Sequence, residues 1–317
     1  MSRTAIVAGL TDTQDTEGAS VSELRNIPTA PTHPVAPAFS PLRRESVYGG
    51  FSLLYMRMPP ITRDDAPCIS ASHSIDMAFI GPVESLTRRS GGPAEVRKVP
   101  HLSGSLHGGE EIAYIEAPEP SEFIEIVPGR HLRTTVAESL GIPGAADLAE
   151  LQIGPDPVLM QTAARIRADA LGGRRLDAVE AEEMVVLTLA SLMERHLGGR
   201  PRPSHTGAPL DARRRARVFD LVEANLHRSL SLNELSDAAA LSKYHFLRAF
   251  KATVGVTPGR YMQARRMEQA RLLLLREGAT TDVVASRVGY SSPSHFRDVF
   301  RQHFGTSPRR YLEEVTG

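Results

Sequence analysis

The chain has a single cysteine, Cys68, among its 317 residues, and it has no tryptophan. One cysteine excludes an intramolecular disulfide framework and is typical of a reducing compartment such as the cytosol. Aromatic residues make up only 5% of the chain, although hydrophobic residues at 41% are sufficient for ordinary cores. Because the length is about twice that of a common single domain, we expect a globular protein with two domains.

Long apolar runs are also missing. The longest strongly apolar stretch, Met184–Met193, is far shorter than the roughly 20 residues that span a bilayer. The first residues lack the cationic segment followed by an apolar segment that marks a secretory signal. We therefore predict a cytoplasmic protein with no membrane partner.

The net charge is zero, but it is distributed unevenly. Residues 211–317 hold 18 Lys and Arg against 11 Asp and Glu, a balance of +7, so the remainder of the chain balances at −7. A cationic module joined to an anionic one favours a polyanionic partner for the C-terminal part.

Pattern and composition divide the chain into four segments. Five prolines lie between Ile27 and Pro41, which favours extended and poorly ordered backbone. Short alternating runs then predict strands up to about Thr135, followed by helices over 157–171 and 177–197. We predict a disordered segment, a domain of strands and helices, a linker and a helical domain over residues 1–45, 46–197, 198–210 and 211–317.

The helical domain repeats itself at an offset of fifty residues. Identical pairs at this offset include Ser242 and Ser292, His245 and His295, Phe246 and Phe296, Phe250 and Phe300, and Tyr261 and Tyr311. So many identities at one offset indicate a supersecondary unit that is present twice.

Each copy is predicted to be a helix-turn-helix unit. The first has a helix over SLNELSDAAA, a turn at Leu241 and a second helix, to Val254, that Ser242 caps. The second has a helix over TTDVVASRV, a turn at Gly289 and a second helix that Ser292 caps.

The phenylalanines of each second helix fix which of its side chains face DNA. Phe246 and Phe250 are four residues apart and share the inward face, as do Phe296 and Phe300. Early outward residues of a recognition helix lie at base edges, where Arg bridges two guanine acceptors, and later ones lie near phosphates. We predict no catalytic, cofactor or metal residue, and from these faces we predict DNA contacts by Lys243, Tyr244, Leu247, Arg248, Lys251, Ser294, Arg297 and Arg301, with Lys251 and Arg301 on phosphates. The caps Ser242 and Ser292 are counted with them as DNA-binding residues.

A long helix is predicted to join the two units, from Thr257-Pro258 to about Glu277. Its length of roughly 27 Å is comparable with one turn of B-DNA, about 34 Å. Both recognition helices are therefore expected to enter successive major grooves on one face of the duplex. The stripe that would hold both units to this helix is Tyr261, Met267, Ala270 and Leu274.

These residues resemble the DNA-binding domain of the AraC/XylS family of bacterial transcription regulators. The second copy carries VVASRVGYSSPSHFRDVFRQHFGTSPRRYL, and the first carries LNELSDAAALSKYHFLRAFKATVGVTPGRYM followed by ARRMEQARLLL. The resemblance covers about a third of the chain and implies seven helices, operator binding and control of transcription, often by dimers on repeated half-sites. By position it places at or near DNA Tyr244, Leu247, Arg248, Pro293, Ser294, His295 and Arg297.

Two positions depart from the family pattern. Asp298 stands where Arg is common, and an Asp there would either accept a hydrogen bond from cytosine or pair with a neighbouring Arg. Ala240 replaces the usual glycine in the turn of the first unit, where a small residue is tolerated.

The resemblance also implies a small cupin-like β-barrel with helices in the N-terminal half, binding an effector or a second subunit. Its helices over 157–171 and 177–197 would either form a dimer face or pack on their own barrel. The histidines do not follow the barrel's usual metal pattern, since His73, His101, His107 and His131 are scattered. The predicted fold class is thus α+β, with a strand-rich domain and an all-α domain of two helix-turn-helix units joined by a long helix.

The leading hypothesis is a non-enzymatic, sequence-specific transcription regulator. Its expected partners are double-stranded promoter DNA, a second copy of the chain, a small-molecule effector in the N-terminal domain and RNA polymerase. One alternative is a cupin-type enzyme domain fused to a DNA-binding module, although no clustered metal triad or acid–base pair is found in 46–135. A second alternative is a non-specific architectural DNA binder.

Overall fold

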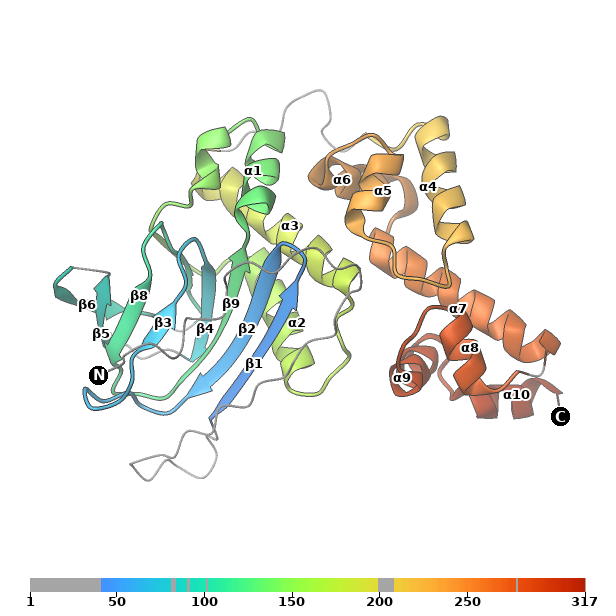
Figure 1. Ribbon diagram of the computed structural model, residues 1–317, viewed down its shortest axis with the longest axis horizontal. Helices are drawn as coiled ribbons and strands as arrows, with labels where there is room; N and C mark the ends of the chain where they lie inside the picture. Colours follow the sequence, from blue (N-terminus) through green and yellow to red (C-terminus); the bar gives the residue numbers. More distant parts are fainter. Residues whose placement is uncertain are drawn as a thin grey trace, which may run out of the picture.

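The computed structural model describes residues 41–80, 84–89, 92–100, 102–198, 208–277 and 279–316 (Figure 1). A strand-rich region precedes a helical region, in agreement with the predicted two-part organisation. Residues 1–40 of the predicted disordered segment and residues 199–207 of the predicted linker lie outside the described residues. In the described part of the chain, no helix has the length and apolarity needed to cross a membrane.

Two antiparallel sheets make up the strand-rich region. Within the described residues the strands are β1 Leu42–Tyr48, β2 Phe51–Met58, β3 Cys68–Ser70, β4 Ile75–Ile80, β5 Glu84–Arg89, β6 Ala94–Lys98, β7 Gly104–Leu106, β8 Ile112–Glu116, β9 Ser121–Pro128 and β10 Leu151–Ile153. The six-stranded sheet has the order β1-β2-β9-β4-β7-β10, and the four-stranded sheet has the order β3-β8-β5-β6. β2 and β9 lie in the middle of the larger sheet and pair along their whole length, from Phe51 opposite Pro128 to Met58 opposite Ser121.

Three α-helices accompany the sheets in the described residues: α1 Arg130–Ser139, α2 Pro157–Ala170 and α3 Ala178–His196. The predicted helices correspond to α2, which Asp156 caps, and α3, which Asp177 caps. α2 packs on β2, β4 and β9 of the six-stranded sheet. The approach is so close that a Cβ on Gly104 would lie 2.5 Å from Cδ2 of Leu159. These helices therefore use much of their apolar surface within the chain.

The sequence-based prediction was wrong at two places in this region. α1 occupies residues that we expected to belong to the strand-rich run, because the β-branched residues of RHLRTTVAES hide a helical spacing of Leu132, Val136 and Leu140, all of which are buried. β1 begins at Leu42, inside the segment predicted to be disordered. Its polar sequence suits an edge strand that pairs only with β2 and stays half-buried.

The helical region contains seven helices within residues 208–277 and 279–316. They are α4 Ala212–Ala224, α5 Leu232–Ala238, α6 Lys243–Val254, α7 Pro258–Glu277, α8 Thr281–Arg287, α9 Pro293–Phe304 and α10 Pro308–Thr316. Helix α7 spans 20 residues, about 30 Å, and links the pair α5–α6 to the pair α8–α9, as Figure 1 shows. Ser242 and Ser292 cap α6 and α9, each accepting from the backbone N–H three residues later, as predicted.

Two hydrophobic clusters divide the helical region. Phe246 and Phe250 of α6 are fully buried in a cluster that continues through α3 into the sheets. Phe296 and Phe300 of α9 are fully buried in a separate cluster, with Met267 of α7. The predicted inward orientation of the four phenylalanines is therefore confirmed. The first helix pair shares its core with the N-terminal region, whereas the second pair has a core of its own.

The two turns differ in a way that the fifty-residue offset does not reveal. In the first unit, the turn after α5 contains Ala240 with φ +51°. In the second unit, the turn after α8 contains Gly289 with φ +81°. Both turns use the same pair of backbone hydrogen bonds, from the αL residue and from its successor. One residue separates Ala240 from the cap Ser242, but two separate Gly289 from the cap Ser292. Ala240 thus adopts a left-handed conformation that favours glycine.

Candidate nucleic-acid interface

Helix α9 presents a polar face to solvent. Ser294, Arg297 and Arg301 are exposed on the side opposite the buried Phe296 and Phe300. The exposed fractions of the Arg297 and Arg301 side chains are 51% and 65%. Exposed arginines on one face of a capped helix can reach base edges and phosphates of duplex DNA without any rearrangement of the helix.

Other predicted residues of α9 are placed less openly. Ser292 and Pro293 are half-buried at the start of the helix. His295 is also half-buried and packs edge-on against Tyr290, with ring centroids 5.4 Å apart. Burial lowers the pKa of His295. These residues therefore lie at the N-terminus of α9 without projecting fully into solvent.

Asp298 pairs with a neighbouring arginine in this structure. Its Oδ1 accepts a hydrogen bond from Arg301 across 3.1 Å. A longer ion pair of 3.6 Å joins Arg297 to Asp282 of α8. Of the two roles considered for Asp298, pairing with Arg is the one seen in the chain without DNA.

Helix α6 is placed quite differently. Tyr244 is 4% exposed and Leu247 only 2% exposed, although both were expected on the DNA-facing side. Lys251, late in the helix, is exposed as its predicted phosphate contact requires. The early part of α6 is covered by α1 and α3 of the N-terminal region, which both pack against it.

Polar contacts accompany this cover. Lys243 forms an ion pair with Glu182 of α3, and both side chains are largely buried. The Tyr244 hydroxyl donates to Glu194 of α3 and accepts from Arg248 across 2.6 Å. Arg248 lies 3.6 Å from the same Glu194 carboxylate. Burial and the hydrogen bond to Glu194 raise the pKa of Tyr244 to about 12.

The N-terminal region also contacts the starts of helices α6 and α7. At the start of α6, the hydroxyl of the cap Ser242 hydrogen-bonds that of Ser139 in α1 across 2.9 Å. At the start of α7, the Gly259 N–H donates to Oε1 of Glu183 across 2.6 Å. Glu183 is 3% exposed, and burial raises the pKa of its carboxyl to about 7.

Contacts by Glu182, Glu183 and Glu194 with the helical region were not predicted from the sequence. These glutamates lie within the helix that was correctly predicted over 177–197, but acidic residues on a long helix are usually solvated. Their only signal was the net negative balance of the segment that carries them. Which helix they would contact depended on domain packing, and no local pattern encodes that.

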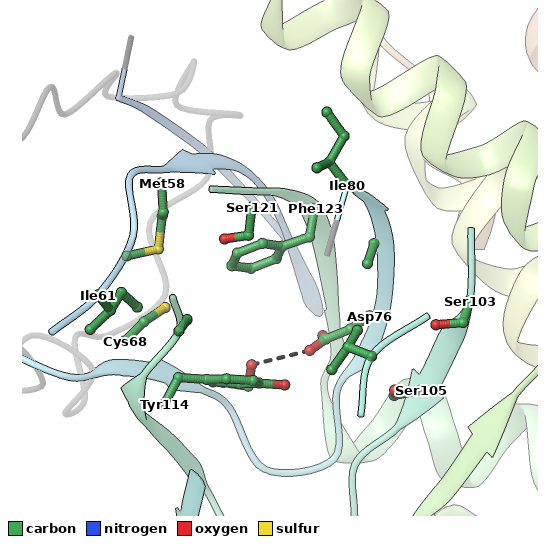
Figure 2. Close-up of a pocket in the computed structure, with 14 residues that line it drawn as sticks. Met58, Ile61, Cys68, Asp76, Ile80, Ser103, Ser105, Tyr114, Ser121 and Phe123 are labelled. Atoms are coloured by element: carbon green, nitrogen blue, oxygen red, sulfur yellow. Dashed lines mark hydrogen bonds between the residues drawn. The ribbon is translucent and has the colours of Figure 1, made fainter. Parts of the chain in front are cut away.

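A cavity of about 560 Å³, counted to its open mouth, lies between the two sheets. Met58, Ile61, Ile80 and Phe123 supply apolar walls, and Asp76 projects into it from β4 (Figure 2). The Asp76 carboxylate accepts from Ser70 across 3.1 Å. The rest of the lining includes hydroxyl groups, among them those of Ser103, Ser105 and Ser121.

Behind the cavity, Asp76 contacts a buried histidine. Nε2 of His107 lies 2.8 Å from Asp76, and His107 is fully buried. Burial by itself lowers the pKa of His107, but the charge and hydrogen bond of Asp76 outweigh it and raise that pKa to about 9. Burial and the Asp76 charge also raise the pKa of Glu125 to about 8. Across the described residues, no group of three or more His, Cys, Asp or Glu side chains is arranged to hold a metal ion.

Comparisons with known proteins concern the helical region. A family model described as a helix-turn-helix domain matches residues 235–314. The probable transcriptional regulator LumQ of Photobacterium leiognathi is 36% identical over 94 residues, which are 30% of this chain and 38% of LumQ. The multiple antibiotic resistance protein MarA of Escherichia coli (strain K12) is 30% identical over 94 residues, which are 30% of this chain and 74% of MarA.

A similar solved structure is the DNA-binding domain of AdpA, described as a global transcriptional factor, in complex with a target DNA. It has 30% sequence identity, covers 32% of this chain and 91% of that chain, and gives a TM-score of 0.31. With the helix-turn-helix match and the extent of MarA that is covered, the chain belongs to the AraC/XylS family of transcription regulators. The chain spans only 38% of the length of LumQ.

Proposed function

We propose that the protein is a sequence-specific DNA-binding transcription regulator whose helices α6 and α9 read two successive major-groove segments. The observation that carries the proposal is the duplicated, serine-capped helix with a cationic outward side. On α9 that side is exposed, with Arg297 and Arg301 free of the core. On α6 the equivalent side carries Lys243 and Arg248.

The length of α7 supports reading by both units at once. Its 20 residues extend for about 30 Å, close to the 34 Å or so of one DNA turn. Two helix-turn-helix units fixed to one rigid helix can therefore meet the duplex on one face. Early side chains such as Arg248 and Arg297 would read bases, while Lys251 and Arg301 would contact phosphates.

The N-terminal residues 46–197 are proposed as a cupin-like regulatory domain, and residues 211–317 as the DNA-binding domain. The cavity between the sheets supports a small-molecule effector. Its apolar walls and the Asp76 carboxylate suit a mostly apolar molecule with a hydrogen-bond donor. Dimerisation on repeated half-sites and contact with RNA polymerase belong to the same proposal.

Selection of bound duplexes from a random oligonucleotide pool by the full-length chain tests this function. We expect the selected duplex to bind at least about a thousandfold more tightly than a scrambled duplex at physiological salt. Equal affinity for both duplexes, with a steep dependence on salt, would identify an architectural DNA binder instead. Absence of binding to any duplex would refute a role in DNA recognition altogether.

A further inference from the structure

Two partners would contact the early part of α6, the N-terminal region and DNA. The proposed DNA recognition uses Lys243, Tyr244 and Arg248, yet these residues contact α3 here. Leu247, which is expected on the same face, is buried. A side chain that is 2–4% exposed, as Leu247 and Tyr244 are, cannot contact a groove at the same time. The N-terminal region and DNA are thus alternative partners for one surface.

The carboxylates of α3 that contact the first unit resemble the phosphates of a DNA backbone. Glu182 accepts from the Lys243 ammonium, and Glu194 accepts from the Tyr244 hydroxyl and lies 3.6 Å from Arg248. Glu183 accepts from the N–H of Gly259 at the start of α7. Phosphate oxygens make the same kinds of contact with Lys, Arg, Tyr and helix N-termini.

Apolar packing favours the same arrangement. Leu247 belongs to the hydrophobic cluster that runs from the sheets through α3 into α4–α6. The second unit has its separate cluster, and the outward Ser294, Arg297 and Arg301 of α9 remain exposed. Of the two recognition helices, α6 is therefore covered and α9 keeps its outward face exposed.

We propose that this structure is a DNA-blocked state, in which the α3 carboxylates (Glu182, Glu183 and Glu194) and Ser139 of α1 occupy the first recognition helix in place of DNA. The proposal rests on the function proposed above. The full operator is bound only when α6 separates from α1 and α3, and until then the chain offers α9 alone. Apparent affinity for the full site is reduced by the fraction of molecules that are closed.

Removing the competing charges in the full-length chain tests the proposal. The variant E182Q/E194Q removes two carboxylates from the contact. The matched control E84Q/E95Q removes two exposed carboxylates from β5 and β6, with the same change in net charge. The probe is a duplex selected from the random pool with the E182Q/E194Q protein, together with its scrambled counterpart.

We expect E182Q/E194Q to bind the selected duplex about tenfold more tightly than both the wild type and E84Q/E95Q. An equal gain for both double variants would show a general charge effect and overturn the proposal. If no gain occurs and the wild type still prefers the selected duplex, the blocked state is refuted while the proposed function stands. If no protein prefers the selected duplex, the proposed function falls and the blocked state with it.

A reversible lock gives a second readout. The Ser139 and Ser242 hydroxyls are 2.9 Å apart, so S139C/S242C places two sulfurs within reach of a disulfide. Oxidised glutathione takes up the two electrons and two protons of the paired thiols and leaves as two molecules of reduced glutathione, and dithiothreitol reverses the reaction. Desolvation raises the pKa of the native Cys68 thiol to about 12, which disfavours the thiolate that attacks a disulfide.

The oxidised S139C/S242C protein should bind the selected duplex at least about tenfold more weakly than the same protein after reduction. The single variants S139C and S242C cannot form this disulfide and can form only a mixed disulfide with glutathione, so they separate the effect of the lock from that of thiol modification. Equal affinity of the oxidised and reduced forms, with the disulfide shown by mass spectrometry, would overturn the proposal.

Discussion

The backbone N–H of Gly259, at the start of α7, donates to Oε1 of Glu183 in α3 across 2.6 Å. A helix N-terminus favours a carboxylate partner, yet this carboxyl is so deeply buried that its pKa rises to about 7. Asp177 and Glu180 raise that pKa further, while Thr257 and Gly259 lower it through hydrogen bonds. The contact between the two regions therefore responds to pH near neutrality.

The Glu183 carboxyl should make the stability of the chain depend on pH. A folded-state pKa of about 7 lies above the ordinary value, so the folded chain binds more protons and Glu183 favours folding most at low pH. That contribution is lost as pH rises through about 7. Compared with E183Q, the wild type should lose about 1–3 kcal/mol of unfolding free energy between pH 5 and pH 8.5.

Urea denaturation of both proteins across this range measures the difference. E95Q, in which an exposed carboxylate is replaced, is the control, and its difference from the wild type should not vary with pH over the same interval. Parallel pH profiles for the wild type and E183Q would show that Glu183 is not held in the strained, buried environment described here.

Arg297→Ala tests base recognition by α9. Arg297 is half exposed and forms a 3.6 Å ion pair with Asp282. We expect a loss of about 1–3 kcal/mol on the selected duplex and relaxed preference at one base pair. Arg63→Ala removes an equal charge from an exposed site in the N-terminal region and should change neither. Equal losses on selected and scrambled duplexes would contradict the assignment.

Lys251→Ala tests the phosphate contact of α6. Lys251 is exposed late in the helix, so its loss should weaken binding to selected and scrambled duplexes alike. The slope of log K against log salt should become shallower by about 0.9, the value for one phosphate contact. Lys98→Ala, at an exposed position of β6, is the control. A slope that is unchanged by Lys251→Ala would remove this residue from the interface.

Ala240→Gly tests the strain in the first turn. Ala240 is exposed and has φ +51°, a region in which a Cβ is unfavourable. The glycine variant should be more stable by about 0.5–1 kcal/mol, after the greater entropy of its unfolded chain is subtracted. Ala252→Gly, at an exposed position inside α6, should instead cost about 1 kcal/mol. Thermal unfolding of both variants checks the sign, and destabilisation by Ala240→Gly would contradict the account.

The helical region was predictable because its signals are local. Serine caps, glycine at turns and phenylalanines four residues apart fix helix bounds and inward faces without reference to the rest of the fold. The same holds for α2 and α3, whose caps Asp156 and Asp177 stand at the expected positions. The extra residue after Gly289 escaped notice, because an offset counted over identical residues passes over a one-residue difference in the turn.

The covering of α6 could not be predicted. Lys243, Tyr244 and Arg248 have the same polar character whether they face DNA or Glu182 and Glu194, so residue type does not distinguish the two partners. The cavity could not be predicted either, because Asp76 and Phe123 come near each other only when β4 and β9 pair within one sheet. α1 was missed because its β-branched residues imitate a strand.

Base-resolved footprinting of the selected duplex, bound by the full-length E182Q/E194Q protein in which α6 is released from α3, tests the central claim most directly. The account predicts two protected major-groove segments on one face, with centres about 10 base pairs apart, and Arg297→Ala should weaken protection in only one of them. A single protected segment, or protection spread evenly along the duplex, would contradict reading by α6 and α9 together.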